Sequence, residues 1–379
     1  MKRRPKVVVA MDSFKGTMSA RDACALVRDG IHEVAPTVEV ILVPMADGGE
    51  GTAEALMTAR GGDWITCSVI GPLPDMTVAA GFAWFEDDRT ALVEMAMASG
   101  IMLVPRDQLD PLRATTYGTG QCLQTALDHG AERLILAVGG SATTDGGVGA
   151  AQALGWRILD AEDQPVPLGG GGLSRIARII PPINRVTPPL EVLCDVTNPL
   201  TGPEGSAAVF GPQKGATPAM IQQLDAGLVH WAHTVRTQLG VEIETLPGAG
   251  AAGGLAAGMV ACMAAKLVPG IDTVMSASGL AGHMAEADWV ISGEGRFDRQ
   301  SLGGKVVSGI QRLARDHRIQ VGVIAGAVQV DEAVCKDQGL AFAWSTAPAE
   351  TPVAEALKTA REDLRATARR FAETHLCAR

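Results

Sequence analysis

The chain has 379 residues, of which 47% are hydrophobic and only 4% aromatic, and its formal net charge is −10. This acidic balance argues against a nucleic-acid-binding surface, because such a surface needs clustered Lys and Arg side chains. The length exceeds what one ordinary core requires and predicts two domains. The 7 cysteines include no Cys-x-x-Cys pair, so we expect neither a disulfide framework nor a zinc site, and the lack of a signal-peptide pattern predicts a cytoplasmic protein.

The first predicted strand covers residues 7–11, which are all apolar, and it runs into the loop Asp-Ser-Phe-Lys-Gly-Thr at 12–17. A loop that places hydroxyls and a lysine beside a glycine is suited to binding an anion. We therefore predict that Ser13 and Lys15 contact a charged ligand. A solvated loop lysine is the alternative interpretation.

The second predicted strand, residues 38–45, ends in a similar loop that contains Asp47 among glycines. Ligands of open α/β sheets bind beyond the carboxyl ends of the strands, so Asp47 is a candidate site residue. Between residues 64 and 104 the pattern changes to short alternating runs separated by Gly-Pro and Asp-Asp turns, which is typical of antiparallel strands. A second fold is predicted to begin there.

The most informative segment is a strand, residues 134–138, followed by the glycine-rich loop Gly-Gly-Ser-Ala-Thr-Thr-Asp-Gly-Gly at 139–147. Its glycines allow backbone N–H groups to approach an anion closely, and its hydroxyls and carboxylate can bind a phosphate or a cation. An ordinary tight turn between a strand and a helix is the alternative. The candidate ligand-binding residues of this loop are Gly139, Gly140, Ser141, Thr143 and Asp145.

Residues 160–189 are rich in Gly and Pro and are predicted to form a loop or mobile connection rather than a regular element. The strand predicted over 190–196 follows, and it presents Asp195 near its end with Asn198 just beyond. Both are candidate site residues, because they follow an apolar strand in the same way as Asp47.

Residues 248–253, Gly-Ala-Gly-Ala-Ala-Gly, match the dinucleotide-binding fingerprint, follow a strand-like run at 241–246 and precede a predicted helix. Asp272 stands at a suitable distance for a ribose-binding acid, but it heads a run with helical spacing. We therefore favour a helix N-terminus that binds a phosphate or carboxylate, with Gly250 and Gly253 as its candidate residues, over an NAD site.

The last third of the chain returns to alternating strands and helices. A strand at 288–291 leads into residues 292–298, where charged side chains and glycines again follow an apolar run. This segment supplies three candidate site residues, Glu294, Arg296 and Asp298. Further strands are predicted at residues 321–325 and 340–344.

Several helix boundaries can be predicted from capping residues. Ser19 with Asp22 forms a capping-box pattern, and Thr217 followed by proline opens a long helix. Gly130 and Gly240 follow apolar stripes as C-terminal caps. The tail from residue 352 is predicted to be an amphipathic helix that covers a sheet with the apolar face Val353, Leu357, Ala360, Leu364, Ala368 and Phe371.

The alternation of strands and helices predicts an α/β protein with parallel strands. The simplest architecture is a first domain made of both chain ends, residues 1–66 and 287–379, interrupted by an inserted domain at 67–286, with a ligand crevice between them. Several carboxylates with glycine-rich loops and a few cations suit phosphoryl transfer, which needs Mg²⁺ ligands, a base or positioning group for a hydroxyl, and donors for phosphates.

A resemblance to a known family is carried by six segments in order, namely residues 12–16, 47–52, 139–147, 195–200, 210–215 and 293–302 with Lys305. Together they resemble the motifs of the bacterial glycerate kinases, which phosphorylate glycerate at its 2-hydroxyl, over nearly the whole chain. The resemblance implies a flavodoxin-like α/β domain interrupted by a second α/β domain, with ATP, Mg²⁺ and D-glycerate meeting in the cleft. It also adds Lys214 and Lys305 to the candidate binding residues.

The residues and the resemblance together predict in-line transfer of the γ-phosphoryl group of ATP to the 2-hydroxyl of D-glycerate, giving 2-phosphoglycerate and ADP. Asp195 is our candidate for the base or positioning group at the hydroxyl, with Asp47 as the alternative, and both are candidate Mg²⁺ ligands. Lys15, with Arg296, would neutralise phosphate or carboxylate charge, while the loop 139–147 would cradle phosphates through its backbone.

Other functions stay open at this point. An NAD(P)-dependent hydroxy-acid dehydrogenase would use residues 248–253, and a kinase for a related small hydroxy acid or a non-catalytic binder of organic acids would use the same loops. We expect small-molecule partners, with no nucleic acid and no membrane, because the uncharged stretch 246–265 is mainly Gly and Ala and supplies little transfer energy. A monomer or a homodimer is expected.

Overall fold

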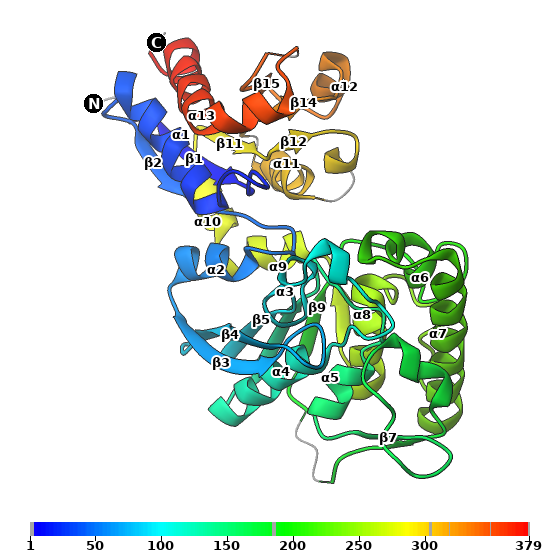
Figure 1. Ribbon diagram of the computed structural model, residues 1–379. Helices are drawn as coiled ribbons and strands as arrows, with labels where there is room; N and C mark the ends of the chain where they lie inside the picture. The colour runs from blue at the N-terminus through cyan, green and yellow to red at the C-terminus, as the bar shows by residue number, and fades with distance from the viewer. Residues whose placement is uncertain (1–3, 184–186, 303–304, 318, 349, 378–379) are drawn as a thin grey trace. The chain divides into compact units, whose positions relative to one another are not determined.

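The computed structural model describes residues 4–377 with the exception of 184–186, 303–304, 318 and 349 (Figure 1). The chain divides into two compact units. Unit 1 comprises Met1–Asp47, Glu54–Gly61 and Ile271–Arg379, and unit 2 comprises Gly48–Ala53 and Gly62–Gly270. In Figure 1, unit 1 is mainly blue and yellow to red, and unit 2 is mainly cyan to yellow-green.

Unit 1 is built on a parallel sheet flanked by helices. Its strands are β1 (Lys6–Met11), β2 (Glu39–Leu42), β11 (Trp289–Gly293), β13 (Gln320–Ala325) and β15 (Phe342–Ser345), with a short separate pair, β12 (Arg296–Phe297) and β14 (Ala327–Val328). Its helices are α1 (Ala20–Val34), α2 (Thr52–Arg60), which begins in unit 2, α9 (Gly270–Ala277), α10 (Leu280–Met284), α11 (Val306–His317), α12 (Glu332–Asp337) and α13 (Val353–His375), and a 3-10 helix covers Gln300–Leu302.

The unit 1 sheet has the strand order β15-β13-β11-β1-β2, and each neighbouring pair is parallel. Numbered by position in the chain and read from the β2 edge, this order is 2-1-3-4-5. β2 is shorter than predicted, although Val43 and Met45 still donate hydrogen bonds to backbone oxygens of β1. The predicted strands of this unit are all present, at residues 7–11, 38–45, 288–291, 321–325 and 340–344.

One face of the unit 1 sheet is covered by α1 and α13. Ser19 caps α1 by accepting a hydrogen bond from the N–H of Asp22 at 3.3 Å, which confirms the predicted cap. The two helices approach closely at Gly30, where a Cβ would lie 2.3 Å from the carbonyl oxygen of Arg365. Their buried contacts form one core with the strands, which includes Val9, Val27, Ile31, Ile291, Leu364 and Phe371.

The first turns of α13 depart from the prediction. The predicted apolar face is buried only from Ala360 onward, where it joins the core. Val353 and Leu357, the first two residues of that face, are 75% and 47% exposed. The sequence pattern cannot show this difference, because the pattern continues past the point where the core of the unit ends.

Unit 2 contains a mixed sheet with helices packed around it. Its strands are β3 (Asp63–Ile70), β4 (Thr77–Phe85), β5 (Thr90–Glu94), β6 (Arg133–Ala137), β7 (Arg157–Leu159), β8 (Arg178–Ile180), β9 (Leu190–Leu193) and β10 (Lys266–Val268). Its helices are α3 (Ala96–Ser99), α4 (Tyr117–His129), α5 (Val148–Ala153), α6 (Ser206–Phe210), α7 (Pro218–Leu239) and α8 (Ala251–Met263), with 3-10 helices at Ile101–Leu103, Arg106–Gln108, Gly170–Arg175 and Pro212–Lys214.

The main sheet of unit 2 has the order β10-β9-β6-β5-β4-β3. β10, β9, β6 and β5 are parallel, whereas β4 pairs antiparallel with both β3 and β5, so the antiparallel strands predicted between residues 64 and 104 are confirmed. The predicted caps are present too. Gly130 ends α4 and Gly240 ends α7, both with positive φ, and Thr217 accepts a hydrogen bond from the N–H of Met220 at the start of α7.

The segment 160–189, predicted as a loop or mobile connection, is only partly irregular. It contains a 3-10 helix and β8, which pairs antiparallel with β7. Residues 184–186 of the segment lie outside the described residues. The prediction was therefore wrong for the 3-10 helix Gly170–Arg175 and for β8, whereas residues 160–169 form no helix or strand.

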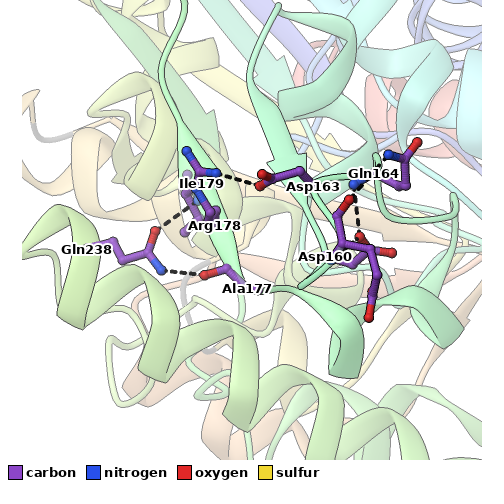
Figure 2. A network of polar contacts seen from close by, with 8 residues as sticks. Asp160, Asp163, Gln164, Ala177, Arg178, Ile179 and Gln238 are labelled. Atoms are coloured by element: carbon purple, nitrogen blue, oxygen red, sulfur yellow. Dashed lines mark hydrogen bonds and ion pairs between the residues drawn. The ribbon is translucent and has the colours of Figure 1, made fainter.

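Side chains explain why this segment is ordered. Figure 2 shows Gln238 of α7, whose side-chain oxygen accepts a hydrogen bond from the N–H of Ile179 at 2.9 Å and whose NH₂ group donates to the carbonyl oxygen of Ala177 at 2.8 Å. Arg178 pairs with Asp163 at 2.5 Å. The two hydrogen bonds of Gln238 attach β8 and the residue before it to a helix that comes much later in the chain, so the local richness in Gly and Pro does not reveal them.

The run before the dinucleotide fingerprint also differs from the prediction. Residues 241–246 form no strand, because they have no sheet neighbour; the carbonyl oxygen of Glu244 instead accepts one hydrogen bond from the N–H of Leu200. Asp272 lies in α9, as its helical spacing predicts, and forms an ion pair with Arg312. The fingerprint therefore lacks both the strand and the ribose-binding acid that an NAD site requires.

Among the helices of the described residues, none combines the length and the apolar character needed to cross a lipid bilayer. The stretch 246–265 forms α8 and the turns on either side of it, and α8 is buried in the core of unit 2.

Candidate active site

A cavity of about 580 Å³ opens at the carboxyl ends of the unit 1 strands. Loops that follow β1, β2, β11, β13 and β15 form its wall, together with the first turns of α13. Ligands of doubly wound sheets bind at this end of the strands. Six of the predicted site residues line the cavity, namely Ser13, Lys15, Asp47, Glu294, Arg296 and Lys305.

The loop after β1 presents Lys15 at its tip. Phe14 and Met18 are buried on either side of the tip and exchange two backbone hydrogen bonds, at 3.0 and 3.1 Å. Gly16 has a φ of +82°, so the chain turns there in the left-handed conformation that favours glycine. The two apolar side chains anchor the loop in the core, while Lys15 between them is exposed.

Three carboxylates of the cavity act on one another. Burial raises the pKa of Asp12 to about 7, and the negative charges of Asp47 and Glu294 contribute to this rise. A hydrogen bond from the N–H of Ser13, at 2.6 Å, and the charge of Lys15 oppose it. The acidic group therefore takes up a proton or a cation readily near neutral pH.

Glu294 is positioned by the short parallel pair β12 and β14. Its carbonyl oxygen accepts a hydrogen bond from the N–H of Gly326 at 3.1 Å, and a Cβ at Gly326 would lie 2.4 Å from the carbonyl oxygen of Gly295. Burial raises the pKa of Glu294, against a hydrogen bond with Ser301 and the charge of Lys305. Its Oε1 is buried and accepts no hydrogen bond from the residues that the structure describes.

Three cationic side chains line the same cavity. Lys15 and Arg296 are exposed, and Lys305 is half-buried. Nε of Arg296 lies 3.4 Å from the carboxylate of Asp298, which is a predicted site residue outside the cavity lining. The cavity thus offers both cations for an anionic ligand and carboxylates for a metal ion.

The glycine-rich loop 139–147 lies in unit 2, directly after β6. Gly139 is half-buried and Gly140 is exposed, whereas the loop is buried from Ser141 onward. The carbonyl oxygen of Thr143 accepts a hydrogen bond from Nζ of Lys214 at 2.5 Å. The part of this loop that is open to a ligand is therefore shorter than its glycine content suggests.

Asp145 is fully buried inside unit 2. Its carboxylate accepts hydrogen bonds from the N–H and hydroxyl of Thr116, at 2.8 and 2.9 Å, and from the N–H of Gly147 at 3.1 Å. Burial raises the pKa of Asp145 despite these bonds. Lys214 is buried as well, and burial lowers its pKa to about 7, opposed by the charge of Asp145. These two predicted binding residues therefore stabilise the loop 139–147 through buried contacts.

Gly250 and Gly253 stand at the start of α8, and both are buried. Gly253 has a φ of +72°, and a Cβ there would lie 1.9 Å from the carbonyl oxygen of Thr143. A Cβ at Gly250 would lie 2.3 Å from the carbonyl oxygen of Pro199. The glycines allow α8 to pack directly on the glycine-rich loop and on the turn after β9.

Asp195 follows β9 and is exposed. Its Oδ1 accepts a hydrogen bond from the N–H of Gly270 at 2.9 Å. Asn198 is half-buried, and its side-chain NH₂ donates to the carbonyl oxygen of Glu204 at 2.7 Å. Of the two carboxylates predicted for the unit 2 part of the site, Asp195 is the accessible one and Asp145 is not.

Asp12 and the loops after β13 and β15 are missing from the predicted site. Asp12 follows the apolar run 7–11 directly, which is the same signal that identifies Asp47, so it could have been found. The loops at 326–329 and 345–348 contain no carboxylate, and their contribution depends on the strand order, which brings both to the cavity.

A parallel α/β sheet that gathers carboxylates, cations and glycine-bearing loops at the ends of its strands is the arrangement of an enzyme that handles phosphates. The fold and the cavity together therefore suit an α/β enzyme that binds phosphates.

Comparison with known proteins gives the family. The glycerate kinase family model matches residues 7–376. The chain is 43% identical over 371 residues to the glycerate kinase of Halalkalibacterium halodurans and 40% identical over 374 residues to the glycerate 2-kinase of Escherichia coli K12, with 97% of each chain covered. A crystal structure described as glycerate kinase 2 from Salmonella typhimurium LT2 is similar with a TM-score of 0.86 at 42% identity, covering 98% of each chain. The protein belongs to the glycerate kinase family.

Proposed function

We propose that the protein phosphorylates D-glycerate at its 2-hydroxyl with ATP as phosphoryl donor and releases 2-phosphoglycerate and ADP. The observation that carries this proposal is the unit 1 cavity, in which three cationic side chains and three carboxylates line one space. Phosphoryl transfer depends on positioning and charge neutralisation more than on covalent chemistry, and this lining supplies the groups for both. Membership of the glycerate kinase family supports the choice of substrate.

In this proposal, unit 1 corresponds to the flavodoxin-like domain predicted at residues 1–66 and 287–379, and unit 2 corresponds to the inserted domain predicted at residues 67–286. The unit boundaries of the structure differ from the predicted ones: unit 1 resumes at Ile271, and unit 2 includes Gly48–Ala53 and continues from Gly62. The strand order 2-1-3-4-5 of the unit 1 sheet supports the first assignment, because it is the order of the flavodoxin-like doubly wound sheet.

Asp195 is the proposed base or positioning group for the 2-hydroxyl of glycerate, with Asp47 as the alternative. Two observations support Asp195. It is exposed, so a substrate can reach it, and the hydrogen bond from the N–H of Gly270 fixes the direction of its carboxylate. A base that is already oriented needs little rearrangement when the substrate binds.

The remaining predicted residues divide into two proposed roles. Those that contact anionic groups are Ser13, Lys15, Gly139, Gly140, Ser141, Asn198, Arg296 and Lys305. Those that position the binding loops are Thr143, Asp145, Lys214, Gly250, Gly253 and Asp298. Burial and internal hydrogen bonds support the second role for Asp145 and Lys214, because their polar atoms already have partners inside unit 2.

Mg²⁺ fits the acidic side of the unit 1 cavity. Among the described residues, no group of three His, Cys, Asp or Glu side chains is arranged to hold a metal ion. Mg²⁺ usually takes only one or two carboxylates and completes its shell with water and substrate phosphates. The buried Oε1 of Glu294, which has no hydrogen bond from the described residues, and the negative charges of Asp47 and Glu294 beside Asp12 suit such a cation. We assign Asp47 and Glu294 to it; the same role for Asp195 stays a prediction.

The bound Mg²⁺ would neutralise phosphate charge during the transfer. The protein's own contribution is to hold the two reactants and the cations in place.

The test of this function is ADP release from the purified protein with Mg-ATP, measured with and without D-glycerate. The product is then offered to enolase alone, which converts 2-phosphoglycerate directly but not 3-phosphoglycerate. Glycerate-dependent ADP with a product that enolase consumes supports the kinase and its regiochemistry. If adding D-glycerate releases no more ADP than the control without it, the assignment is overturned.

The dehydrogenase that residues 248–253 left open is not proposed. The fingerprint has no preceding strand, and its glycines are buried against other backbone segments. A nicotinamide cofactor needs those glycines to be open to its pyrophosphate.

A further inference from the structure

The unit 1 cavity is larger than a three-carbon acid requires. Its volume of about 580 Å³ falls within the range of roughly 300–1,000 Å³ that is typical of pockets for larger organic ligands. D-Glycerate is small and polar at every carbon, so it has little apolar surface to bury. A ligand that fills this cavity must be longer than glycerate.

The lining changes character along the edge of the sheet. The charged residues follow β2, β1 and β11, which are neighbours in the sheet, and they are Asp12, Lys15, Asp47, Glu294, Arg296 and Lys305. The residues that follow β13 and β15 carry no charge, and they include Ala327, Val328, Ala347 and Pro348. Neighbouring strands lie about 4.8 Å apart, so three spacings separate β1 from β15 by roughly 14 Å. The cavity therefore has a charged part and an apolar part.

The apolar part continues onto the first turns of α13. Val353 is 75% exposed and Leu357 is 47% exposed, and both line the cavity. They stand four residues apart, so they lie on the same side of the helix. Single exposed apolar side chains are common on protein surfaces. Two that adjoin in the wall of a charged cavity are suited to covering one face of a flat apolar group.

Polar groups border this apolar wall. Ser345 lines the cavity, and its hydroxyl accepts a hydrogen bond from the N–H of Val328 at 2.9 Å, which leaves the hydroxyl proton available to a ligand. Gln329 and Thr346 line it as well and add both donors and acceptors. A heteroaromatic base has apolar faces and a polar edge, and this combination of groups matches it.

We propose that the unit 1 cavity is the nucleotide site, in which the base of ATP packs on Val353 and Leu357 and the phosphates extend toward Lys15, Arg296 and Lys305. The inference rests on the proposed function for the identity of the nucleotide. The separation between the two parts of the cavity suits an extended nucleoside triphosphate, and their different chemistry suits its two ends. The exposed apolar face at the start of α13 acquires its partner only when the nucleotide binds.

The test compares two substitutions in the same turn of α13. Leu357→Asp places a carboxylate in the apolar wall, whereas Ala354→Asp places one at an exposed position that does not line the cavity. Binding of Mg-ADP to each full-length variant is measured by titration calorimetry, which requires no turnover. We expect Leu357→Asp to weaken Mg-ADP binding about tenfold and Ala354→Asp to change it less than twofold. Equal affinities of the two variants would overturn the proposal.

Kinetics separates this inference from the proposed function. In the glycerate-dependent assay, Leu357→Asp should raise the KM for ATP about tenfold and leave the KM for D-glycerate unchanged. A raised KM for glycerate alone would overturn the nucleotide assignment while the kinase stands. Weakened Mg-ADP binding in a protein without glycerate-dependent turnover would overturn the kinase while the nucleotide site stands. Val353→Asp, at a more exposed position, serves as a second variant should Leu357→Asp fold poorly.

Discussion

Charged side chains are exposed in one glycine-bearing region of this molecule and buried in the other. In unit 1, the loops after β1 and β11 keep Lys15 and Arg296 exposed and leave Oε1 of Glu294 without a hydrogen bond from the described residues. In unit 2, the loop 139–147 buries Asp145 and surrounds it with donors, while Lys214 donates to the loop backbone. Unsatisfied polar atoms in a cavity indicate a place for a ligand, whereas satisfied ones indicate a structural support.

The difference also concerns stability. Burial of Asp12 raises its pKa, and the negative charges of Asp47 and Glu294 add to this rise, so the unit 1 cavity holds a carboxylate whose charged form is unfavourable. The charges in unit 2 stabilise a single loop conformation, because removing any one of them would leave a buried group without its partner. Binding sites commonly lower the stability of the ligand-free protein, because their charged groups are placed to contact a ligand.

The largest effect that we predict tests whether close backbone packing fixes the conformation of the loop 139–147 in unit 2. Gly253→Ala should lower the free energy of unfolding by about 4 kcal/mol or more, because the new Cβ would overlap the carbonyl oxygen of Thr143 and the residue would keep a positive φ. Urea denaturation followed by tryptophan fluorescence measures the change. Gly202→Ala is the matched control, since Gly202 has a φ of +85° with open space around it, and it should cost about 1 kcal/mol. Equal losses of unfolding free energy in the two variants would mean that the loop can shift to make room for the new Cβ.

The next effect tests Asp195 as the proposed base or positioning group. Asp195→Asn should lower kcat by about a hundredfold or more without changing the melting temperature, because the amide oxygen can still accept the hydrogen bond from Gly270 but the base is lost. Asp225→Asn is the control. Its carboxylate also accepts from a backbone N–H, that of Gly202 at 2.9 Å, and kcat should not change. Near-normal turnover of Asp195→Asn would transfer the role to Asp47.

A smaller effect tests the cost of charging the buried Asp12 in the unit 1 cavity. The folded pKa of Asp12, about 7, lies above its ordinary value of 3.8, so its protonated form stabilises the protein fully below about pH 4 and this contribution is lost as the pH rises through 7. Asp12→Asn does not titrate. It should therefore gain stability relative to the wild type between pH 5 and pH 8, by about 2 kcal/mol, while its activity falls. Urea unfolding at both pH values gives the comparison; parallel pH profiles of the two proteins would refute the raised pKa of Asp12.

The smallest effect concerns the exposed cation. Lys15→Ala should raise the KM for ATP about tenfold, since one charge-assisted contact to phosphate is lost. Lys358→Ala removes a lysine that is exposed on α13 and does not line the cavity, and it should leave the KM unchanged. Steady-state kinetics of ADP release measures both. The same KM for the two variants would remove Lys15 from the proposed nucleotide site.

Local chemistry made much of the fold predictable. The strand at 7–11 and the caps Ser19, Gly130 and Gly240 are decided by residues next to one another in the chain, and the structure confirms them. The segment 160–189 was mispredicted, because its order comes from the distant side chain of Gln238.

The candidate site was predictable to the extent that it follows strand ends. Lys15, Asp47 and Glu294 come directly after apolar strands, and the structure brings them to one cavity. Burial could not be predicted in the same way. Asp145 has the sequence surroundings of a ligand-binding residue, but its partner Thr116 is remote in the sequence. The exposure of Val353 depends on where the core of unit 1 ends, which no local pattern encodes.

The connectivity of unit 1 has a consequence for synthesis on the ribosome. β1 lies between β2 and β11, and Val7 cannot meet its partner Trp289 until the whole of unit 2 has been translated. Unit 2 is nearly continuous in the chain and can bury its core first. During that interval β1 and β2 present an unpaired strand edge, which is a template for pairing with another chain. The nascent protein is therefore most exposed to aggregation just before β11 emerges.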